Sequence, residues 1–270
     1  MILSVIIPVY KKSFLSESKT IVTLCEMLNV VRPSIKVKIH VWNNGPCLVV
    51  NNIPFNIYFD LDVVQSTKNC SLAMVYNTVI EKNSNSDCYL ILDDDTEITS
   101  QFLDEVIRFI MYRNDILAVP TIACADRIVS PVYESLIRRI YTGTLNSSNF
   151  RAIGSGLVIP SSVIKTFIHR PFDENLTLYG IDTKFCYDYR ELFNEFYVLR
   201  TTLNHDVAGF KVLPLDNFKF REINLAKAML YIILNCKGVR ALYFFRIIKV
   251  VFKYVLRAKD LDILRGLFTR

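Results

Sequence analysis

Three consecutive carboxylates follow a short apolar run in the stretch YLILDDDTEIT, residues Tyr89–Thr99. Adjacent like charges at the mouth of a buried strand repel one another unless a cation lies among them. Hard oxygen donors at such a place suit Mg²⁺ or Mn²⁺, which keep some water ligands and take others from phosphate groups. The sequence therefore predicts a divalent cation bound by Asp93 and Asp95. The alternative is a solvated acidic turn that caps the helix expected from Ser100.

Two further side chains have chemistry that suits a site. His205 ends an apolar segment and begins HDVAG; imidazole is an acceptable ligand for Mn²⁺, although a lone histidine is more often a hydrogen-bonded structural residue. Asp182, in YGIDTKF, is placed either to cap the helix expected after it or to act as a general base that deprotonates an acceptor hydroxyl. Both roles use the same oxygen atoms, so the spacing leaves the two interpretations open.

Alternating strand-like and helix-like segments must position these residues, and this alternation predicts a mostly parallel sheet covered on both faces. The expected strands are Leu3–Pro8, Ile35–Trp42, Ile57–Val63, Tyr89–Leu92 and Ile116–Ile122. The expected helices are Ser16–Val30, Ser71–Glu81 and Ser100–Tyr112. Ligands bind outside the carboxyl ends of the strands in such a sheet. We therefore expect a site where Pro8-Val9-Tyr10, Asn43-Asn44-Gly45 and Asp93-Asp94-Asp95 converge.

The composition indicates a globular intracellular protein. The chain has 270 residues, and its 51% hydrophobic content supplies a packed core. Seven cysteines without a C-x-x-C pair indicate reduced thiols and a cytosolic location. The N-terminal apolar run is short and precedes Pro8 and two lysines, which favours a buried strand over a signal peptide. Lysine or arginine interrupts every apolar segment, so we expect no membrane-spanning helix.

Seven short segments, in order, resemble the motifs of family 2 inverting glycosyltransferases with the GT-A fold: SVIIPVY, WNNG, NCSLAMVYN, LDDDT, GSG, YGID and HDVAG. The resemblance covers residues 2–210 and is strongest to bacterial enzymes of O-antigen or capsular polysaccharide synthesis, including rhamnosyltransferase-like members. It implies an α/β fold of the GT-A type, with a Rossmann-like, mostly parallel central sheet flanked by helices. It also implies transfer of a sugar from a UDP- or dTDP-linked donor, dependent on Mn²⁺ or Mg²⁺, to a glycan or a polyprenyl-diphosphate-linked saccharide.

The resemblance assigns a role to each matching residue. Pro8 and Tyr10 would border the nucleotide base, and Asn43 would contact the base or ribose where the family usually has an aspartate. The other residues expected to bind the nucleotide sugar are Asn44, Asn69, Asn77, Asp93, Asp94 and the small-residue segment Gly154, Ser155 and Gly156.

The same resemblance assigns the chemistry. Asp93 and Asp95 match the D-x-D pair that holds the metal against the donor diphosphate, and His205 matches a histidine that approaches the metal in some members. Asp182 matches the catalytic base, with Ile181 where an acidic residue often precedes it. The base would deprotonate the acceptor hydroxyl for an in-line displacement that inverts the anomeric carbon.

The C-terminal part of the chain differs from the rest in charge. Residues 211–270 contain 13 Lys and Arg against 4 Asp and Glu. We predict a GT-A domain over residues 1–220, with a nucleotide-binding half at 1–100 and an acceptor half at 101–220, and a basic amphipathic helical tail at 221–270.

A basic stripe on the tail, formed by Arg246, Lys249, Lys253 and Arg257, accompanies a strongly apolar helix, a combination typical of an interfacial membrane anchor. The alternative is a helix packed on the core or on a second subunit. Nucleic-acid binding is not expected, because the tail's aromatic residues lie within aliphatic runs. We therefore expect a cytoplasmic enzyme that is peripheral on the inner face of the cell membrane through residues 225–270.

Two other functions compete with this interpretation. An aspartate-nucleophile phosphatase or phosphotransferase also has an Asp-x-Asp pair after an apolar strand, but Glu97 stands where that family has Thr or Val, and its motif normally lies near the N-terminus. A non-catalytic membrane-associated protein that keeps the fold is the second alternative. Intact acidic residues at 93, 95 and 182 argue against it.

Overall fold

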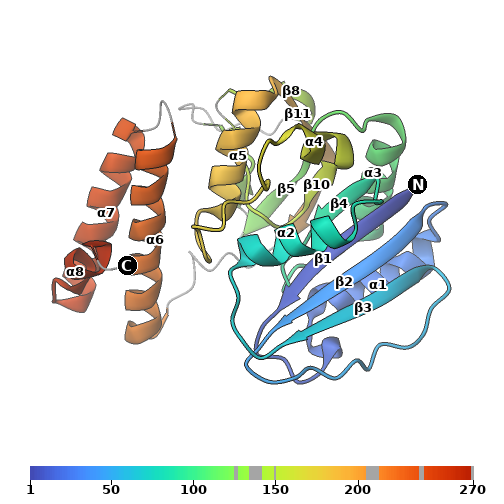
Figure 1. Cartoon of the computed structure of the whole chain (residues 1–270), viewed down its shortest axis with the longest axis horizontal. Helices are drawn as coiled ribbons and strands as arrows, with labels where there is room; N and C mark the ends of the chain where they lie inside the picture. The colour runs from blue at the N-terminus through green and yellow to red at the C-terminus, as the bar shows by residue number, and fades with distance from the viewer. Residues whose placement is uncertain (125–126, 134–141, 149, 205–212, 237–239, 269–270) are drawn as a thin grey trace.

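In the computed structural model, a nine-stranded sheet lies between two layers of helices (Figure 1). The structure describes residues 1–124, 127–133, 142–148, 150–204, 213–236 and 240–268. The strand order is β3-β2-β1-β4-β10-β5-β11-β8, with β6 paired to β5. These strands are β1 (Ile2–Val9), β2 (Lys36–Asn44), β3 (Phe59–Ser66), β4 (Cys88–Ile91), β5 (Ala118–Cys124), β6 (Arg127–Ser130), β8 (Gly143–Asn146), β10 (Leu157–Pro160) and β11 (Glu195–Asn204). Two short strands, β7 (Val132–Tyr133) and β9 (Phe150–Arg151), pair separately.

Most strands of the sheet run in the same direction, as the sequence predicts, whereas β6, β8 and β10 run in the opposite direction. Strands β3, β2, β1 and β4 pair in parallel, and so do β5 and β11, whereas β10 runs antiparallel to both β4 and β5. The chain goes from β1 outward to β2 and β3, then returns to place β4 on the other side of β1. A reversal of this kind opens a crevice at the carboxyl ends of the two central strands. The residues that follow β1 and β4 therefore border a crevice.

Helices cover both faces of the sheet. On one face lie α1 (Lys19–Val31) and α3 (Ser100–Tyr112), and on the other lie α2 (Leu72–Lys82), α4 (Ser161–Thr166) and α5 (Ile181–Leu192) (Figure 1). The helix expected from Ser16 begins at Lys19, because Ser18 is its N-cap and accepts a hydrogen bond from the Ile21 backbone N–H at 3.3 Å.

Three helices form the C-terminal region: α6 (Leu215–Asn235), α7 (Arg240–Ala258) and α8 (Asp262–Phe268). They share a small core of Phe218, Ala226, Val250, Tyr254 and Ile263. The boundary predicted after residue 220 falls inside α6, so the helical region begins earlier, at Leu215. No helix of the described chain combines the length and apolar character needed to cross a membrane.

The helical region packs directly on the α/β domain through α6. Gly180, which precedes α5, has a φ of 78°, and a β-carbon built on it would stand 3.1 Å from the Ala228 Cβ. Glycine is required at this position both for its backbone conformation and for the close approach of α6. The region is therefore a packed part of the fold rather than a separate tail.

Candidate active site

Two adjacent cavities lie where β1 and β4 end. The larger, which we call the outer cavity, has a volume of about 750 Å³. Most of the residues predicted to bind the nucleotide sugar or the metal line it: Pro8, Tyr10, Asn44, Asn69, Asp93, Asp94 and Asp95. The fold thus brings together residues from three strand ends, as the parallel-sheet prediction requires.

The smaller cavity, which we call the inner cavity, has a volume of about 290 Å³. Asp93 lies in its wall as well as in that of the outer cavity, and Gly154 and Asp182 complete the polar part of its lining. Apolar and aromatic side chains form most of the rest, including Tyr76, Ile153 and Tyr179. Asp93 of the acidic turn and Asp182 therefore line the same cavity.

Hydrogen bonds to buried hydroxyls fix the backbone of the acidic turn. The Thr20 hydroxyl donates to the Asp93 and Thr96 carbonyls and accepts from the Thr96 N–H at 2.8 Å. On the other side, the Asp93 N–H donates to Ser155 Oγ at 3.2 Å. The backbone from which the three carboxylates project is therefore held from both sides.

The three carboxylates differ in their surroundings. Lys12 Nζ lies 3.7 Å from Asp94 Oδ2, so the chain itself supplies a cation to the middle aspartate. Burial raises the pKa of Asp94, and the charge of Lys12 opposes that shift. Asp93 and Asp95 flank Asp94 in the wall of the outer cavity.

A divalent cation fits this donor set. Within the described ranges, no group of three or more His, Cys, Asp or Glu side chains is arranged to hold a metal by itself. Mg²⁺ and Mn²⁺ are commonly bound by one or two carboxylates together with water and substrate phosphates, which is what Asp93 and Asp95 offer. His205, the third predicted ligand, lies outside the described residues.

Asp182 lies in the first turn of α5 and does not cap the helix, which corrects one of the two interpretations from the sequence. The N-cap residue is Gly180. Asp182 Oδ1 accepts a hydrogen bond from the Thr183 N–H at 2.6 Å. Burial raises the pKa of Asp182, while bonds from the Thr183 hydroxyl and backbone and from the Gly154 backbone, and the charge of Arg151, lower it. A carboxylate with a raised pKa in a cavity wall is suited to accept a proton.

Asn43, predicted to contact the base or ribose, has a structural role instead. It is fully buried. Its amide nitrogen donates to the Cys47 carbonyl at 2.7 Å and to Gln65 Oε1 at 2.8 Å, and its oxygen accepts from the Gly45 N–H at 3.1 Å. The side chain holds the turn after β2. This structural role differs from the contact with the base or ribose that the sequence predicts.

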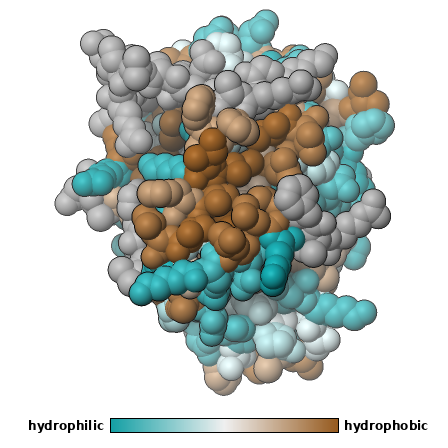
Figure 2. All heavy atoms as spheres, turned by 90° about the vertical axis from the view of Figure 1, so that its left-hand side faces the viewer, coloured by the Kyte–Doolittle hydropathy of each residue, from teal (hydrophilic) through white to brown (hydrophobic). Residues whose placement is uncertain are grey.

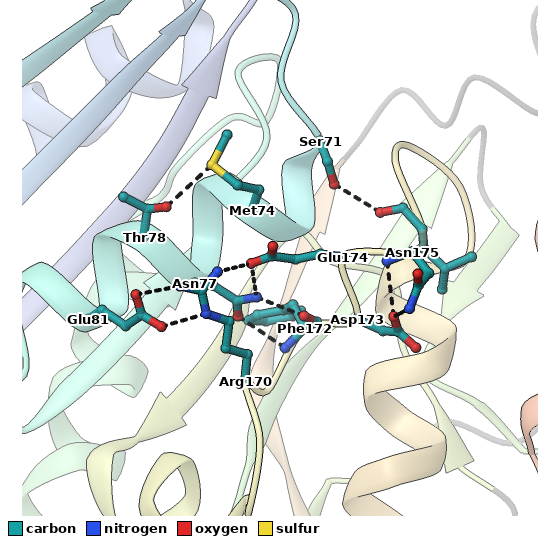
Figure 3. Close-up of polar contacts among 11 residues, drawn as sticks. Ser71, Met74, Asn77, Thr78, Glu81, Arg170, Phe172, Asp173, Glu174 and Asn175 are labelled. Carbon is teal, nitrogen blue, oxygen red and sulfur yellow. Dashed lines mark hydrogen bonds and ion pairs between the residues drawn. The ribbon is translucent and has the colours of Figure 1, made fainter.

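Asn77, another predicted nucleotide ligand, is also fully buried. Its amide nitrogen donates to the Phe172 carbonyl at 2.7 Å and its oxygen accepts from the Phe172 N–H at 3.1 Å, so it pairs with that backbone as a strand would (Figure 3). A third bond, 2.9 Å long, joins it to Glu174. Asn77 therefore positions the segment before α5. This structural role differs from the direct nucleotide contact that the sequence predicts.

Residues 170–180 are held against α2 at several points (Figure 3). Arg170 pairs with both Glu81 and Glu174, and the Ser71 hydroxyl donates to the Leu176 carbonyl at 2.9 Å. The Leu72 N–H donates to the Thr177 carbonyl at 3.0 Å. These contacts place Leu178 in the walls of both cavities.

The three residues of the small-residue segment, Gly154 to Gly156, have different roles in the structure. Gly154 lines the inner cavity. Ser155 is 1% exposed and supports the acidic turn rather than facing a ligand. Gly156 has a φ of 91°, and a β-carbon there would stand 2.5 Å from Pro120 Cγ, so it is required for packing. The donor-sugar role predicted from the sequence is thus retained for Gly154 alone.

Several residues in the cavity walls were not predicted. Tyr76 lies in the inner cavity, and Phe220 and Asn224 of α6 lie in the outer one. The two α6 residues are one turn apart, but an aromatic and an amide at that spacing carry no chemical signature in a sequence. The C-terminal region therefore contributes to the site itself.

Comparison with solved structures identifies the type of fold. A fragment of S. aureus TarS solved with UDP-GlcNAc matches 99% of this chain and 78% of that chain, with a TM-score of 0.54 and 13% identity. A structure of S. aureus TarS matches 95% of this chain and 43% of that chain (TM-score 0.54, 15% identity). GalNAc-T7 solved with UDP, GalNAc and Mn²⁺ matches 84% and 47% (TM-score 0.50, 12% identity). These likenesses confirm the α/β fold of the GT-A type.

Two further comparisons give no match. No protein-family model and no curated protein sequence matches the chain.

Proposed function

We propose that this protein is an inverting glycosyltransferase that moves a sugar from a UDP- or dTDP-linked donor to an acceptor hydroxyl. The observation that carries the proposal is the place of Asp93 in the walls of both cavities, which joins the acidic turn to the cavity that contains Asp182. The similar structures support the donor class, since they were solved with UDP, UDP-GlcNAc, or UDP and Mn²⁺.

The outer cavity would bind the nucleoside diphosphate. It lies at the reversal of strand order, where open α/β sheets bind their ligands. Tyr10 is 44% exposed there and offers an aromatic face to a base. Asp93 and Asp95 would hold Mn²⁺ or Mg²⁺, which when bound offsets the charge of the leaving diphosphate.

Asp182 would act as the base. It takes the proton of the acceptor hydroxyl as that oxygen attacks the anomeric carbon, and no covalent intermediate on the protein is needed. Gly154 leaves space beside it, because a β-carbon there would stand 3.9 Å from the Asp182 Cβ. The apolar lining of the inner cavity limits access of water to the reacting groups.

For the acceptor, we propose a polyprenyl-diphosphate-linked saccharide of surface polysaccharide synthesis, of the O-antigen or capsule type, with rhamnosyl transfer as one form of this hypothesis. A lipid-linked acceptor requires the enzyme to reach a membrane. The five exposed apolar residues of α7, which we call the α7 ridge, offer such a contact: Phe244, Phe245, Ile248, Phe252 and Leu256.

The α7 ridge is 49–69% exposed, and Figure 2 shows a continuous hydrophobic patch on this side of the molecule, with hydrophilic residues along its lower border. Lys249 is exposed beside the ridge. Two other members of the predicted basic stripe are exposed but contact α6: Lys253 bonds Glu222 at 3.1 Å, and Arg257 lies 4.3 Å from the Phe218 ring centroid. We propose that the ridge, with its cationic edge, rests on the anionic inner face of the cell membrane.

Thermal shift with UDP-, dTDP- and GDP-sugars, each with and without Mn²⁺, tests the donor assignment. We expect stabilisation by one nucleotide class that depends on Mn²⁺. No response to any nucleotide would contradict the proposal. Turnover of a simple phosphate ester without nucleotide would instead favour the phosphatase alternative, and nucleotide binding without transfer would favour the non-catalytic one.

Sedimentation with phosphatidylglycerol vesicles tests the membrane contact. The double variant Phe245→Glu with Phe252→Glu should stay in the supernatant, because carboxylates on the ridge oppose both insertion and the lipid charge. Phe55→Glu is a matched control, since Phe55 is 92% exposed and lies outside the C-terminal helices. Equal sedimentation of both variants would contradict the membrane contact.

A further inference from the structure

Three arginines gather around two buried tyrosines where α5 meets the C-terminal helices. Arg190 of α5 lies over the ring of Tyr187, with its guanidinium carbon 4.1 Å from the ring centroid. Tyr187 packs edge-on against Tyr243 of α7, with ring centroids 6.0 Å apart. Arg151 of β9 donates to the Tyr243 hydroxyl at 3.2 Å, and the Arg246 guanidinium lies 5.0 Å from the Tyr243 ring centroid. We call this group the arginine cluster.

Two of these arginines, Arg190 and Arg246, lack an acidic partner among the described residues. Arg190 Nη1 is also buried without a hydrogen-bond partner there. On the same helix, Asp188 is already bound to Lys184 at 2.6 Å. A buried guanidinium nitrogen is costly to leave without a hydrogen-bond partner, so Arg190 is a suitable point of attachment for a bound anion.

The cluster lies between the candidate base and the α7 ridge. Arg190 follows Asp182 by eight residues on α5, a rise of about 12 Å along the helix. The base and the cluster are further joined through Cys186, whose thiol accepts from the Ala152 N–H at 3.3 Å, next to Arg151. On the other side, Arg246 follows directly after Phe245 of the ridge.

We propose that the arginine cluster binds the diphosphate of a lipid-linked acceptor. Guanidinium groups match phosphate oxygens in geometry as well as charge, and three of them suit a dianionic or trianionic group better than a single carboxylate. The position suits an acceptor whose reacting hydroxyl is on a sugar near Asp182 and whose lipid leaves toward α7. The identity of the ligand as an acceptor rests on the proposed function, whereas the phosphate-binding chemistry does not.

Calorimetric titration of the full chain with inorganic pyrophosphate, in EDTA, tests the binding chemistry. Without a divalent cation the three aspartates of the outer cavity repel the probe, so only a cationic site can bind it. We expect Arg190→Gln and Arg246→Gln each to weaken binding about tenfold or more. Arg265→Gln on α8 is the charge-matched control, because Arg265 is 87% exposed, and it should leave binding unchanged. No binding of pyrophosphate, or equal binding by all variants, would overturn the site.

A second pair of probes separates the two sources of such a phosphate. Geranyl diphosphate stands for the acceptor, and phosphatidylglycerol vesicles stand for a lipid headgroup. The proposal expects the arginine variants to lose geranyl diphosphate while keeping vesicle binding through the α7 ridge. Loss of vesicle binding with no affinity for geranyl diphosphate would assign the cluster to headgroups and overturn the acceptor assignment.

Two controls keep the result interpretable. Arg190→Lys retains the charge but not the planar fork, so it should recover part of the affinity only if the ligand is an anion. Thermal shift by UDP with Mn²⁺ should be the same in all variants. If the wild-type chain shows no such shift, the proposed function fails, but the pyrophosphate titration still decides whether the cluster binds phosphate.

Discussion

Asp93 and Asp182, from the end of β4 and the start of α5, lie in the walls of the same cavity, and Tyr76 lies beside both. Burial raises the pKa of the Tyr76 hydroxyl well above its usual value, and the charges of Asp93 and Asp182 raise it further. One cavity thus joins a carboxylate suited to a metal–diphosphate complex with a carboxylate suited to take a proton. This relationship separates the roles of the acidic residues and leads to the following predictions.

Asp182→Asn should abolish sugar transfer without unfolding the protein. Loss of a general base lowers the rate by about 10²–10⁴-fold. The folded-state pKa of Asp182 is raised by burial, so its contribution to stability is present at low pH and is lost as pH rises through that pKa. At neutral pH the neutral amide should therefore melt at the same temperature as Asp182 or higher. A large fall in melting temperature together with retained turnover would contradict the assignment.

Transfer should show an acidic limit set by the same carboxyl group. Only ionised Asp182 accepts a proton, and its raised pKa moves the loss of activity to a higher pH than an ordinary aspartate would give. The check is the pH dependence of kcat with saturating donor and metal. A profile that stays flat down to the pKa of an exposed carboxylate would exclude Asp182 as the base.

Asp95→Ala and Asp94→Asn should differ sharply. Removal of a metal ligand forfeits several kcal/mol of charge stabilisation, which lowers transfer by about 10³-fold or more. Asp94 is paired with Lys12, so its amide variant should keep Mn²⁺-dependent stabilisation by the nucleotide. Thermal shift with nucleotide and Mn²⁺ measures both variants. An equal loss in the two would mean that Asp94 is a ligand too.

Asn77→Ala should destabilise the fold rather than remove a nucleotide contact. The change leaves the Phe172 N–H and carbonyl unpaired in a buried place, which costs about 1–3 kcal/mol. Asn52→Ala, at an exposed amide bonded to Ser16, should change the free energy of unfolding by less than about 0.5 kcal/mol. Urea unfolding provides the comparison. Unchanged stability with weakened nucleotide binding would restore the contact predicted from the sequence.

Gly180→Ala should disturb the outer cavity through α6. Gly180 and Gly143 have φ values of 78° and 91°, but only Gly180 has a neighbour, since a β-carbon at Gly143 meets nothing within 4 Å. Both alanine variants should lose about 1–3 kcal/mol from backbone strain. Only Gly180→Ala should also weaken nucleotide binding, because α6 carries Phe220 and Asn224. Equal nucleotide affinity in both variants would show that α6 does not shape the donor site.

Much of the α/β domain was predictable from local pattern. The helix over 100–112 agrees with the structure at both ends, and the predicted strands lie within or overlap β1 to β5. Apolar periodicity and N-capping residues are local signals, so they survive without knowledge of the partners. Convergence at the strand ends followed from the parallel sheet alone, and the structure places Tyr10, Asn44 and the acidic turn in one cavity.

The sequence by itself determined the order of the strands and helices up to β5, the carboxylate turn after a buried strand and the basic, apolar character of the C-terminal region. The tertiary structure decided what each polar side chain does. Asn43 and Asn77 form hydrogen bonds with backbone groups, and the N-cap of α5 is Gly180 rather than Asp182. It also decided that α6 packs on Gly180 and lines the outer cavity. Residue type fixes which bonds a side chain can make, but the partner is chosen by contacts between segments far apart in the chain, and no local pattern contains those contacts.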